Sequence, residues 1–314
     1  MNSTLQYIIR RTLYLIPVLL GVCLLIFVLF NVAGNDPAAS LLGKNATAEQ
    51  LAEVREELGL NKPLWLQYVD VVKSAFTFDF GRSWVSKQKI TDMIAKGAIP
   101  SLTVSLPAFV ISTLLGIILA MLVAHYRGKG VDNFVRVTAI AMMSVSSLVY
   151  ILFFQWLFAY KLDLFEIMGY EEGFPYFIPY VLLPVFIWVA LSVGPDVRFF
   201  RTIFLDEIYQ DYVRTAKAKG LSERKVLFKH VLRNAMIPIL TYTVVQLPFL
   251  LMGALLIESF FGIPGLGDMT ITALNSSDFP VLKALAILSA VAYVLFTMIQ
   301  DVLYTIVDPR VKLR

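Results

Sequence analysis

Six stretches of this chain contain no Asp, Glu, Lys or Arg for seventeen or more residues, and no other feature constrains the fold as strongly. They cover residues 12–35, 97–126, 137–160, 173–195, 234–257 and 284–300. About 20 apolar residues in a helix span the hydrocarbon core of a membrane. The sequence therefore predicts an all-α membrane protein with six transmembrane helices. A composition of 58% hydrophobic and 16% charged residues agrees with this and argues against a water-soluble enzyme.

The first charge-free stretch follows Arg10 and Arg11, so it must be distinguished from a secretory signal peptide. It is about twice as long as the 7–15-residue core of a signal, and no clear small-x-small cleavage site follows it. We therefore interpret it as a retained membrane anchor. The single cysteine, Cys23, lies within this stretch, and one cysteine excludes an internal disulfide.

Basic residues are distributed unequally between the loops. If the N-terminus is cytoplasmic, four segments are cytoplasmic, and they hold 17 of the 27 Lys and Arg residues: 1–11, 127–136, 196–233 and 310–314. Most of the others lie in the external segment 34–96, which is too long to obey the positive-inside rule strictly. We therefore expect both termini in the cytoplasm, a lipid bilayer with anionic lipid at the cytoplasmic face, and no nucleic-acid partner.

These assignments divide the chain into four parts. We expect a cytoplasmic N-terminus at 1–11, a first span at 12–33, an external segment with short helices at 34–96, and a transmembrane domain at 97–310. Within that domain we expect spans at about 100–124, 137–160, 174–195, 234–257 and 284–303, and a long cytoplasmic loop at 196–233. A cytoplasmic tail is expected at 304–314.

The external segment carries helix and interface signals. Thr47 and Gln50 form a capping box, and Gly59 is placed to end the helix that follows. Aromatic and β-branched residues interrupted by single charges run from Trp65 to Phe80, which suits a segment lying at the membrane interface. The same stretch could instead dock an external partner.

The predicted spans contain hydroxyl and amide side chains but no charged ones. Ion-coupled carriers usually bind their ion through ionisable groups at membrane depth. The absence of such groups from the predicted spans counts against a secondary transporter. The polar side chains that could line a path for a solute are Ser144, Ser147, Gln155, Thr243 and Gln246. Hydrogen bonds between helices would explain the same residues equally well.

The long cytoplasmic loop is predicted to hold two short helices. Asp211 can cap the first helix, 212–219, and Gly220 supplies a left-handed stop. Ser222 can cap the second helix, which continues into the fifth span. Apolar residues recur on one face of each helix, which favours a compact pair that docks a partner over a solvated connection.

The same loop carries a specific motif. It reads Asp211, Tyr212, Val213, Arg214, Thr215, Ala216, Lys217, Ala218, Lys219, Gly220, Leu221, Ser222, followed by His230, Asn234 and Pro238. This run resembles the cytoplasmic signature of binding-protein-dependent ABC (ATP-binding cassette) importer permeases of the oligopeptide, dipeptide and nickel class. Further matching runs at 79–83, 100–103, 261–267 and 308–310 extend the resemblance over essentially the whole chain. The long external segment resembles that of the first, B-type, permease of such systems.

One part of the motif departs from the general family signature. That signature begins Glu-Ala-Ala, with glycine six positions after the glutamate. Here Arg214, Thr215 and Ala216 occupy the three positions, and Gly220 keeps its place. The departure is similar to that of the peptide class.

The resemblance implies the type I ABC importer permease fold in a bacterial cytoplasmic (inner) membrane. In the family, the helix pair around Gly220 fits a groove on a cytoplasmic ATPase subunit, and two such ATPases bind the ATP and Mg that drive transport. The other implied partners are a second homologous permease and an external solute-binding protein. This chain has no phosphate-binding Gly-x-x-x-x-Gly-Lys loop, so we expect a transport subunit that is not itself an enzyme.

The external run with Gly262, Pro264, Gly265 and Gly267 could fold back as a gate or support the binding protein, or it could be a plain tight loop. Peptides, di- or oligopeptides, are the expected solute, and nickel chelates or another small polar compound are the alternatives. With two histidines and no Cys or His cluster, we expect no metal site in the chain.

Two other classes of protein compete with this interpretation. A self-sufficient channel or carrier would explain six spans but not the patterned cytoplasmic helix pair. An intramembrane enzyme would need paired carboxylates, a metal site or a Ser–His pair within the spans, and the predicted spans contain none of these.

Overall fold

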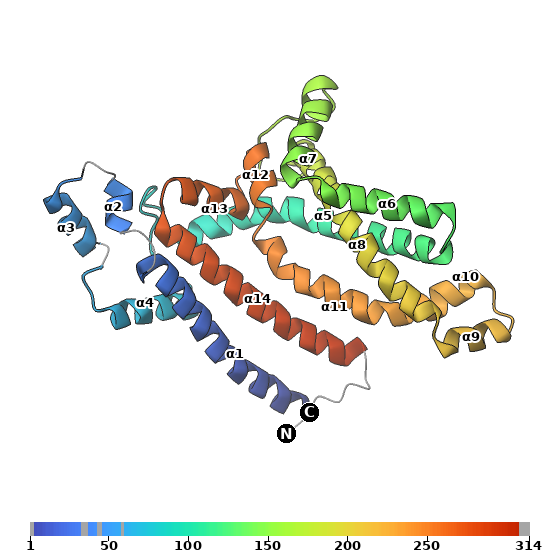
Figure 1. Ribbon diagram of the computed structural model, residues 1–314. Helices are drawn as coiled ribbons and strands as arrows, with labels where there is room; N and C mark the ends of the chain where they lie inside the picture. Colours follow the sequence, from blue (N-terminus) through green and yellow to red (C-terminus); the bar gives the residue numbers. More distant parts are fainter. Residues whose placement is uncertain (1–2, 33–36, 43–45, 58–59, 308–314) are drawn as a thin grey trace.

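The computed structural model describes residues 3–32, 37–42, 46–57 and 60–307, and this part of the chain is almost entirely helical (Figure 1). The first helices are α1 (Ser3–Phe27), α2 (Pro37–Leu42), α3 (Ala48–Glu57), α4 (Leu64–Thr77), α5 (Ile90–His125), α6 (Gly130–Ser144), α7 (Ser147–Phe154) and α8 (Ile178–Ile208). They are followed by α9 (Asp211–Ala218), α10 (Glu223–Lys225), α11 (Leu232–Leu251), α12 (Leu255–Phe261), α13 (Leu266–Asn275) and α14 (Phe279–Val307). π-Helical turns at Val28–Val32, Gln155–Lys161 and Val226–Val231 extend α1, α7 and α10. The predicted helix stop at Gly59 and the tail 308–314 lie outside the described residues.

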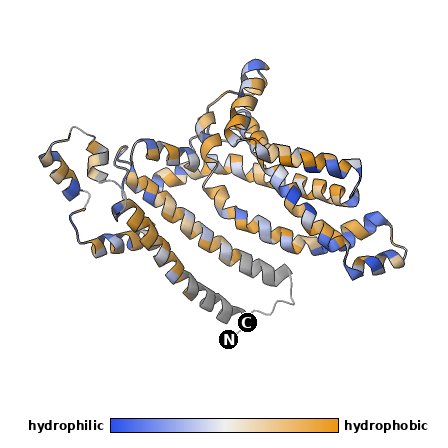
Figure 2. Ribbon diagram, in the orientation of Figure 1, coloured by the Kyte–Doolittle hydropathy of each residue, from blue (hydrophilic) through white to orange (hydrophobic). Residues whose placement is uncertain are grey.

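Four described helices are long and apolar enough to cross a membrane: Ile90–His125, Ile178–Ile208, Glu223–Leu251 and Phe279–Ile299. Helices α6 and α7 with its π-helical extension pass the same test only as a bent pair. Helix α1, the expected first span, contributes a shorter apolar part, Ile16–Asn31. Figure 2 shows apolar residues along these helices, and hydrophilic residues gathered on α3, α9 and α10.

Residues 137–160 do not form one straight span, contrary to the prediction. Val145 and Ser146 both have extended backbone, with ψ angles of 134° and 142°, and this interrupts the helical hydrogen bonds between α6 and α7. The carbonyl of Ser146 then accepts the first bonds of α7, from the N–H groups of Val149 and Tyr150. The two halves consequently meet at an angle of 94°.

Two other helices have bounds that differ from those of the predicted spans. Helix α8 begins at Ile178 and continues beyond residue 195 as far as Ile208, so the first part of the predicted loop is helical. Helix α11 ends at Leu251 and not at residue 257. It ends there because Gly253, with a φ of +68°, turns the chain back into α12.

Helices α5 and α8 pack closely at the centre of the fold. The buried face of α5 is made largely of small residues at helical spacing: Ser101, Ser105, Ala108, Ser112, Gly116, Ala120 and Ala124. A Cβ at Gly116 would lie 2.9 Å from the Cβ of Asp196 on α8. Small residues of this kind allow helix backbones to approach each other in membrane proteins.

Within the segment 34–96, helix α4 packs against α1 and α14. The predicted capping box is confirmed, since the Gln50 N–H donates to Thr47 Oγ1 (3.3 Å) and the Thr47 N–H donates to Gln50 Oε1 (3.0 Å). The Tyr68 hydroxyl on α4 donates to the Leu20 carbonyl of α1 (3.0 Å). Cys23, Ile26, Ala75 and Ile287 form one buried cluster, which joins α1, α4 and α14.

Candidate functional site

Helices α9 and α10 form the helix pair that the motif predicts, at one end of the bundle (Figure 1). Gly220 has a φ of +75°, and its N–H donates to the Lys217 carbonyl (2.9 Å), so it ends α9 in the left-handed conformation as predicted. One of the two predicted cap positions is wrong, and the other is occupied as predicted but lacks the capping hydrogen bond. The N-cap of α9 is Gln210, because Asp211 already lies in the first turn with its side chain exposed. Ser222 does hold the N-cap position of α10, but its side chain makes no capping bond.

The inner face of α9 is fixed to the ends of three long helices. Val213 and Ala216 are buried in a cluster with Ala120 and Ala124 of α5, Phe200 and Phe204 of α8, and Ala235 and Ile239 of α11. The Tyr212 hydroxyl donates to the Glu207 carboxylate of α8. Burial, together with this bond, raises the pKa of Tyr212 to about 12. Helix α9 is therefore anchored by both apolar and polar contacts.

The outer face of the pair is hydrophilic and mostly basic. Its exposed residues include Arg214, Thr215, Lys217, Ala218, Lys219, Arg224 and Lys225. Figure 2 shows this hydrophilic surface at the α9–α10 end of the molecule. Glu223 lies 3.7 Å from the His125 imidazole at the end of α5. The pair thus presents a rigid, charged surface that is suited to contact another protein.

At the opposite end, helices α12 and α13 enclose a carboxylate that the sequence reasoning missed. Glu258 is fully buried. Its Oε1 accepts a bond from the Ala254 N–H (3.0 Å), and its Oε2 accepts bonds from the Gly267 (2.8 Å) and Asp268 (3.3 Å) N–H groups. Burial raises the pKa of Glu258 to about 7, and these bonds partly oppose that rise.

Steric crowding around Glu258 explains why glycine occupies the neighbouring positions. A Cβ on Gly253 would lie 2.0 Å from Glu258 Oε1, and one on Gly265 would lie 2.2 Å from Glu258 Oε2. Ser101 of α5 accepts a bond from the Leu266 N–H (2.8 Å), which ties the loop to α5. The sequence did contain a signal for this buried carboxylate: a glutamate flanked by glycines, which leave room for its side chain.

The external run that the sequence singled out is therefore partly buried. Gly265 and Gly267 are enclosed around Glu258, whereas Gly262 and Pro264 are exposed. Gly262 adopts a φ of +63° and turns the chain between α12 and α13. The run folds back against the bundle, and only its tip faces outward.

The five residues proposed to line a transport path all lie in helices. The side chains of several of them already form hydrogen bonds within the protein. The Ser144 and Thr243 hydroxyls donate to carbonyls one turn back in their own helices. The Gln155 side chain donates to the Ile167 carbonyl (2.8 Å) and the Phe260 carbonyl (3.4 Å), which links α7 to the loop after it and to α12. Ser147 opens α7, and Gln246 lies half-buried in α11. A role of these side chains in transport stays a prediction.

Two buried carboxylates lie within the helical bundle, just outside the predicted charge-free spans. Asp196 of α8 accepts a bond from the Tyr242 hydroxyl of α11 (3.2 Å). Asp132 of α6 accepts two bonds from the Arg201 guanidinium of α8 (2.9 and 3.0 Å). The sequence prediction ended the span at residue 195 and so assigned Asp196 and Arg201 to a loop, whereas α8 continues and packs both of them within a helix. Asp132 lay in the predicted cytoplasmic segment 127–136, which is helical from Gly130 onward.

Several apolar helices, an anchored basic helix pair at one end and a folded-back loop at the other define a multi-pass membrane permease that works with partner proteins. The chain belongs to the family of binding-protein-dependent transport system inner membrane components. Residues 112–313 match the main domain of that family, and residues 4–107 match the N-terminal domain of its membrane components. The resemblance found in the motif is thereby confirmed, and the chain is a permease subunit of a bacterial ABC importer in the inner membrane.

Characterised relatives extend the match over the full length. The chain is 32% identical, over 308 residues, to the glutathione transport system permease proteins of Shigella flexneri (serotype 5b), Salmonella typhimurium (strain LT2) and Escherichia coli (strain K12). The alignment covers 98% of this chain and 99% of each relative.

Proposed function

We propose that this subunit carries small peptides, glutathione among them, from an external solute-binding protein into the cytoplasm. The full-length similarity to glutathione permeases supports a peptide as the solute. Nickel chelates, carried by other members of the same class, are the second candidate.

The proposed assembly contains a second homologous permease and two cytoplasmic ATPase subunits that bind ATP and Mg. In it this chain has six spans, with both termini in the cytoplasm. Helix α1 would supply one span and the bent pair α6–α7 another, beside the four long apolar helices. The excess of Lys and Arg in the predicted cytoplasmic segments supports this orientation.

The observation that carries the proposal is the anchoring of α9. Because Val213 and Ala216 are buried against the ends of α5, α8 and α11, a displacement of α9 would move those helices with it. A flexible loop would absorb the same displacement. The exposed basic face of α9 would contact the ATPase subunit, and ATP-driven movement of that subunit would then reach the membrane spans.

The proposal is tested by reconstitution. The chain is purified with its partner subunits and placed in vesicles with the cognate binding protein, and uptake of glutathione, dipeptides, a pentapeptide and a nickel chelate is measured with and without ATP. We expect ATP-dependent uptake of a peptide. Uptake of the nickel chelate alone would overturn the proposed solute, and uptake by this chain without ATPase subunits would overturn the proposed mechanism.

A further inference from the structure

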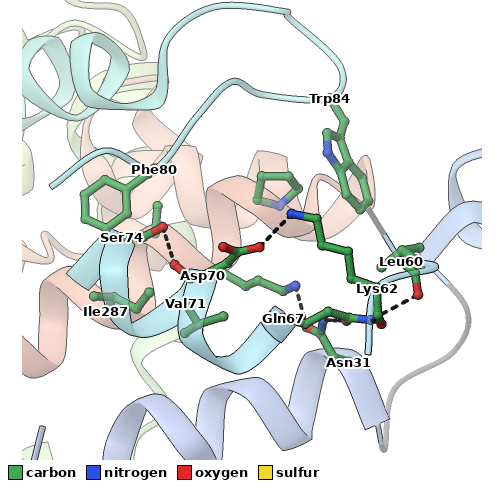
Figure 3. A pocket seen from close by; sticks show the side chains of 13 residues that line it. Asn31, Leu60, Lys62, Gln67, Asp70, Val71, Ser74, Phe80, Trp84 and Ile287 are labelled. Atoms are coloured by element: carbon green, nitrogen blue, oxygen red, sulfur yellow. Dashed lines mark hydrogen bonds and ion pairs between the residues drawn. The ribbon is translucent and has the colours of Figure 1, made fainter. Parts of the chain in front are cut away.

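A polar cavity of about 260 Å³ lies between the end of α1, helix α4 and the start of α14 (Figure 3). Its lining includes Asn31, Lys62, Gln67, Asp70, Trp84 and Lys283. In Figure 1 this region lies at the end of the bundle remote from α9 and α10. Its volume is slightly below the range of typical small-molecule pockets, so the cavity has room for a small ligand or for one polar group of a larger one.

Lys283 supplies an unbalanced positive charge to this cavity. It lies one turn into α14, near the positive end of the helix dipole, and it is half-buried. Its ammonium group has three donors, and one of them bonds to Asn31 Oδ1 (2.5 Å). Among the described residues, no carboxylate lies within ion-pair distance of Lys283, and the ion pairs that do form involve basic residues other than Lys283.

A chain of hydrogen bonds holds the Lys283 ammonium in place. Asn31 Nδ2 donates to Gln67 Oε1 (2.8 Å), and Gln67 Nε2 donates to the carbonyls of Leu60 (3.0 Å) and Lys62 (2.8 Å). Figure 3 shows Asn31 and Gln67 facing each other at the edge of the cavity. The ammonium is thus positioned before any ligand arrives, which lowers the entropic cost of binding.

The other charges of the cavity cancel. Lys62 Nζ lies 2.9 Å from Asp70 Oδ2, and the two form an ion pair across the cavity wall (Figure 3). One net positive charge therefore remains, at Lys283. A cation would be repelled by it, and a neutral ligand would leave a half-buried charge without a counter-ion. A group with a single negative charge would complement it.

The helix beside this cavity carries side chains of the kind found at the membrane interface. Helix α4 exposes four large apolar side chains, namely Leu64, Trp65, Val69 and Phe76. Exposed aromatic and apolar residues beside the ends of spanning helices are typical of the membrane interface, which is the depth of the phospholipid phosphates.

We propose that this cavity binds one oxyanion, a phosphate or carboxylate group, through Lys283, with Lys62 as a second donor. The phosphate of an anionic phospholipid and a soluble anion are two sources of the same chemistry. The site is independent of the transported solute and of the ATPase contact.

The test uses the chain purified together with its partner subunits. Inorganic phosphate is titrated against the complex in detergent, and bound phosphatidylglycerol is counted by native mass spectrometry after extraction from nanodiscs of phosphatidylcholine and phosphatidylglycerol. The main variant is Lys283→Gln, and Lys283→Arg retains the charge. The matched control is Lys73→Gln, which removes an exposed lysine of α4 that is outside the cavity lining.

We expect the wild-type complex and Lys73→Gln to bind one anion equally well, and Lys283→Gln to bind it at least about tenfold more weakly. Lys283→Arg should retain binding. Asn31→Asp gives Lys283 an internal counter-ion without a change of size, so it should also abolish binding, even if Lys283→Gln does not assemble.

The two probes distinguish the sources. Retention of phosphatidylglycerol without phosphate binding assigns the site to lipid, and the reverse assigns it to a soluble anion. Equal binding by wild type, Lys283→Gln and Asn31→Asp would overturn the proposal, as would a wild-type complex that binds neither probe.

Discussion

Replacement of Gly220 by Val tests whether the turn between α9 and α10 transmits the action of the ATPase. Gly220 has a φ of +75°, and a Cβ built on it would meet no atom within 4 Å. A Cβ at residue 220 therefore adds no clash. The expected effect of the substitution comes from placing a β-branched residue in the left-handed region.

The expected cost is about 1–2 kcal/mol, which is the penalty of a left-handed conformation for an L-residue. A change of this size lowers the ratio of ordered to alternative turn conformations by a factor of about 5–30. The buried contacts of Val213 and Ala216 do not involve residue 220, so the variant should still fold and enter the membrane. The loss should be confined to the geometry of the turn.

Gly128 provides a matched control. It lies in the turn between α5 and α6, has a φ of +74°, and has equally open space around its Cβ position. Gly128→Val should therefore cost about the same 1–2 kcal/mol of backbone strain. It lies outside the α9–α10 motif.

The assay compares ATP hydrolysis and solute uptake in vesicles that contain the assembled transporter and the binding protein. We expect Gly220→Val to lower the amount of solute taken up per ATP hydrolysed, and Gly128→Val to behave as wild type. If both variants lose uptake in parallel, the effect is one of general stability. If neither does, the turn has no part in coupling, and the argument from its left-handed conformation is refuted.

Three further outcomes follow from the buried polar groups. The pKa of Glu258 is raised from 4.5 to about 7, so between these pH values the folded state binds a proton that the unfolded state has released. The free energy of unfolding should therefore fall as the pH rises through this range, by at most about 3 kcal/mol. Thermal unfolding of Glu258→Gln should lack this pH dependence. Gly265→Ala places a Cβ 2.2 Å from Glu258 and should cost about 1–3 kcal/mol, whereas Gly130→Ala, with open space around it, should not lower the unfolding temperature. Asp132→Asn leaves the partly buried Arg201 without its charge partner and should destabilise the fold by about 1–3 kcal/mol in denaturant unfolding; no measurable loss would contradict a stabilising role of this ion pair.

The features that the sequence predicted correctly depend on neighbouring residues. The helix pair and its turn follow from Gly220 and from apolar residues at helical spacing, and the capping box needs only Thr47 and Gln50. Each of these signals is complete within one turn of helix or a few residues of chain. Local propensity and hydrogen bonding then decide the structure.

The features that were missed depend on contacts between distant segments. The burial of Glu258 requires Ser101 and the N–H groups after Gly265 to meet it, and nothing within α12 indicates such partners. Asp196 looked like the first residue of a loop because a charge ended the apolar run, yet Tyr242 of α11 supplies a hydrogen bond within the bundle. Hydropathy alone cannot distinguish a charge at the end of a span from one that is buried and satisfied.

Helix α5 contacts structural elements at both ends of the molecule, so a rigid tilt of this one helix would move both ends together. Ser101 binds the loop around Glu258, and Ala124, on the same helix, lies in the cluster that holds α9. At a rise of 1.5 Å per residue, the two points are about 35 Å apart along the helix axis, so a tilt of about 5° around one would displace the other by about 3 Å. The distance between the two ends of the molecule is thus bridged by a single stretch of helix, and no relay of separate contacts is needed between them.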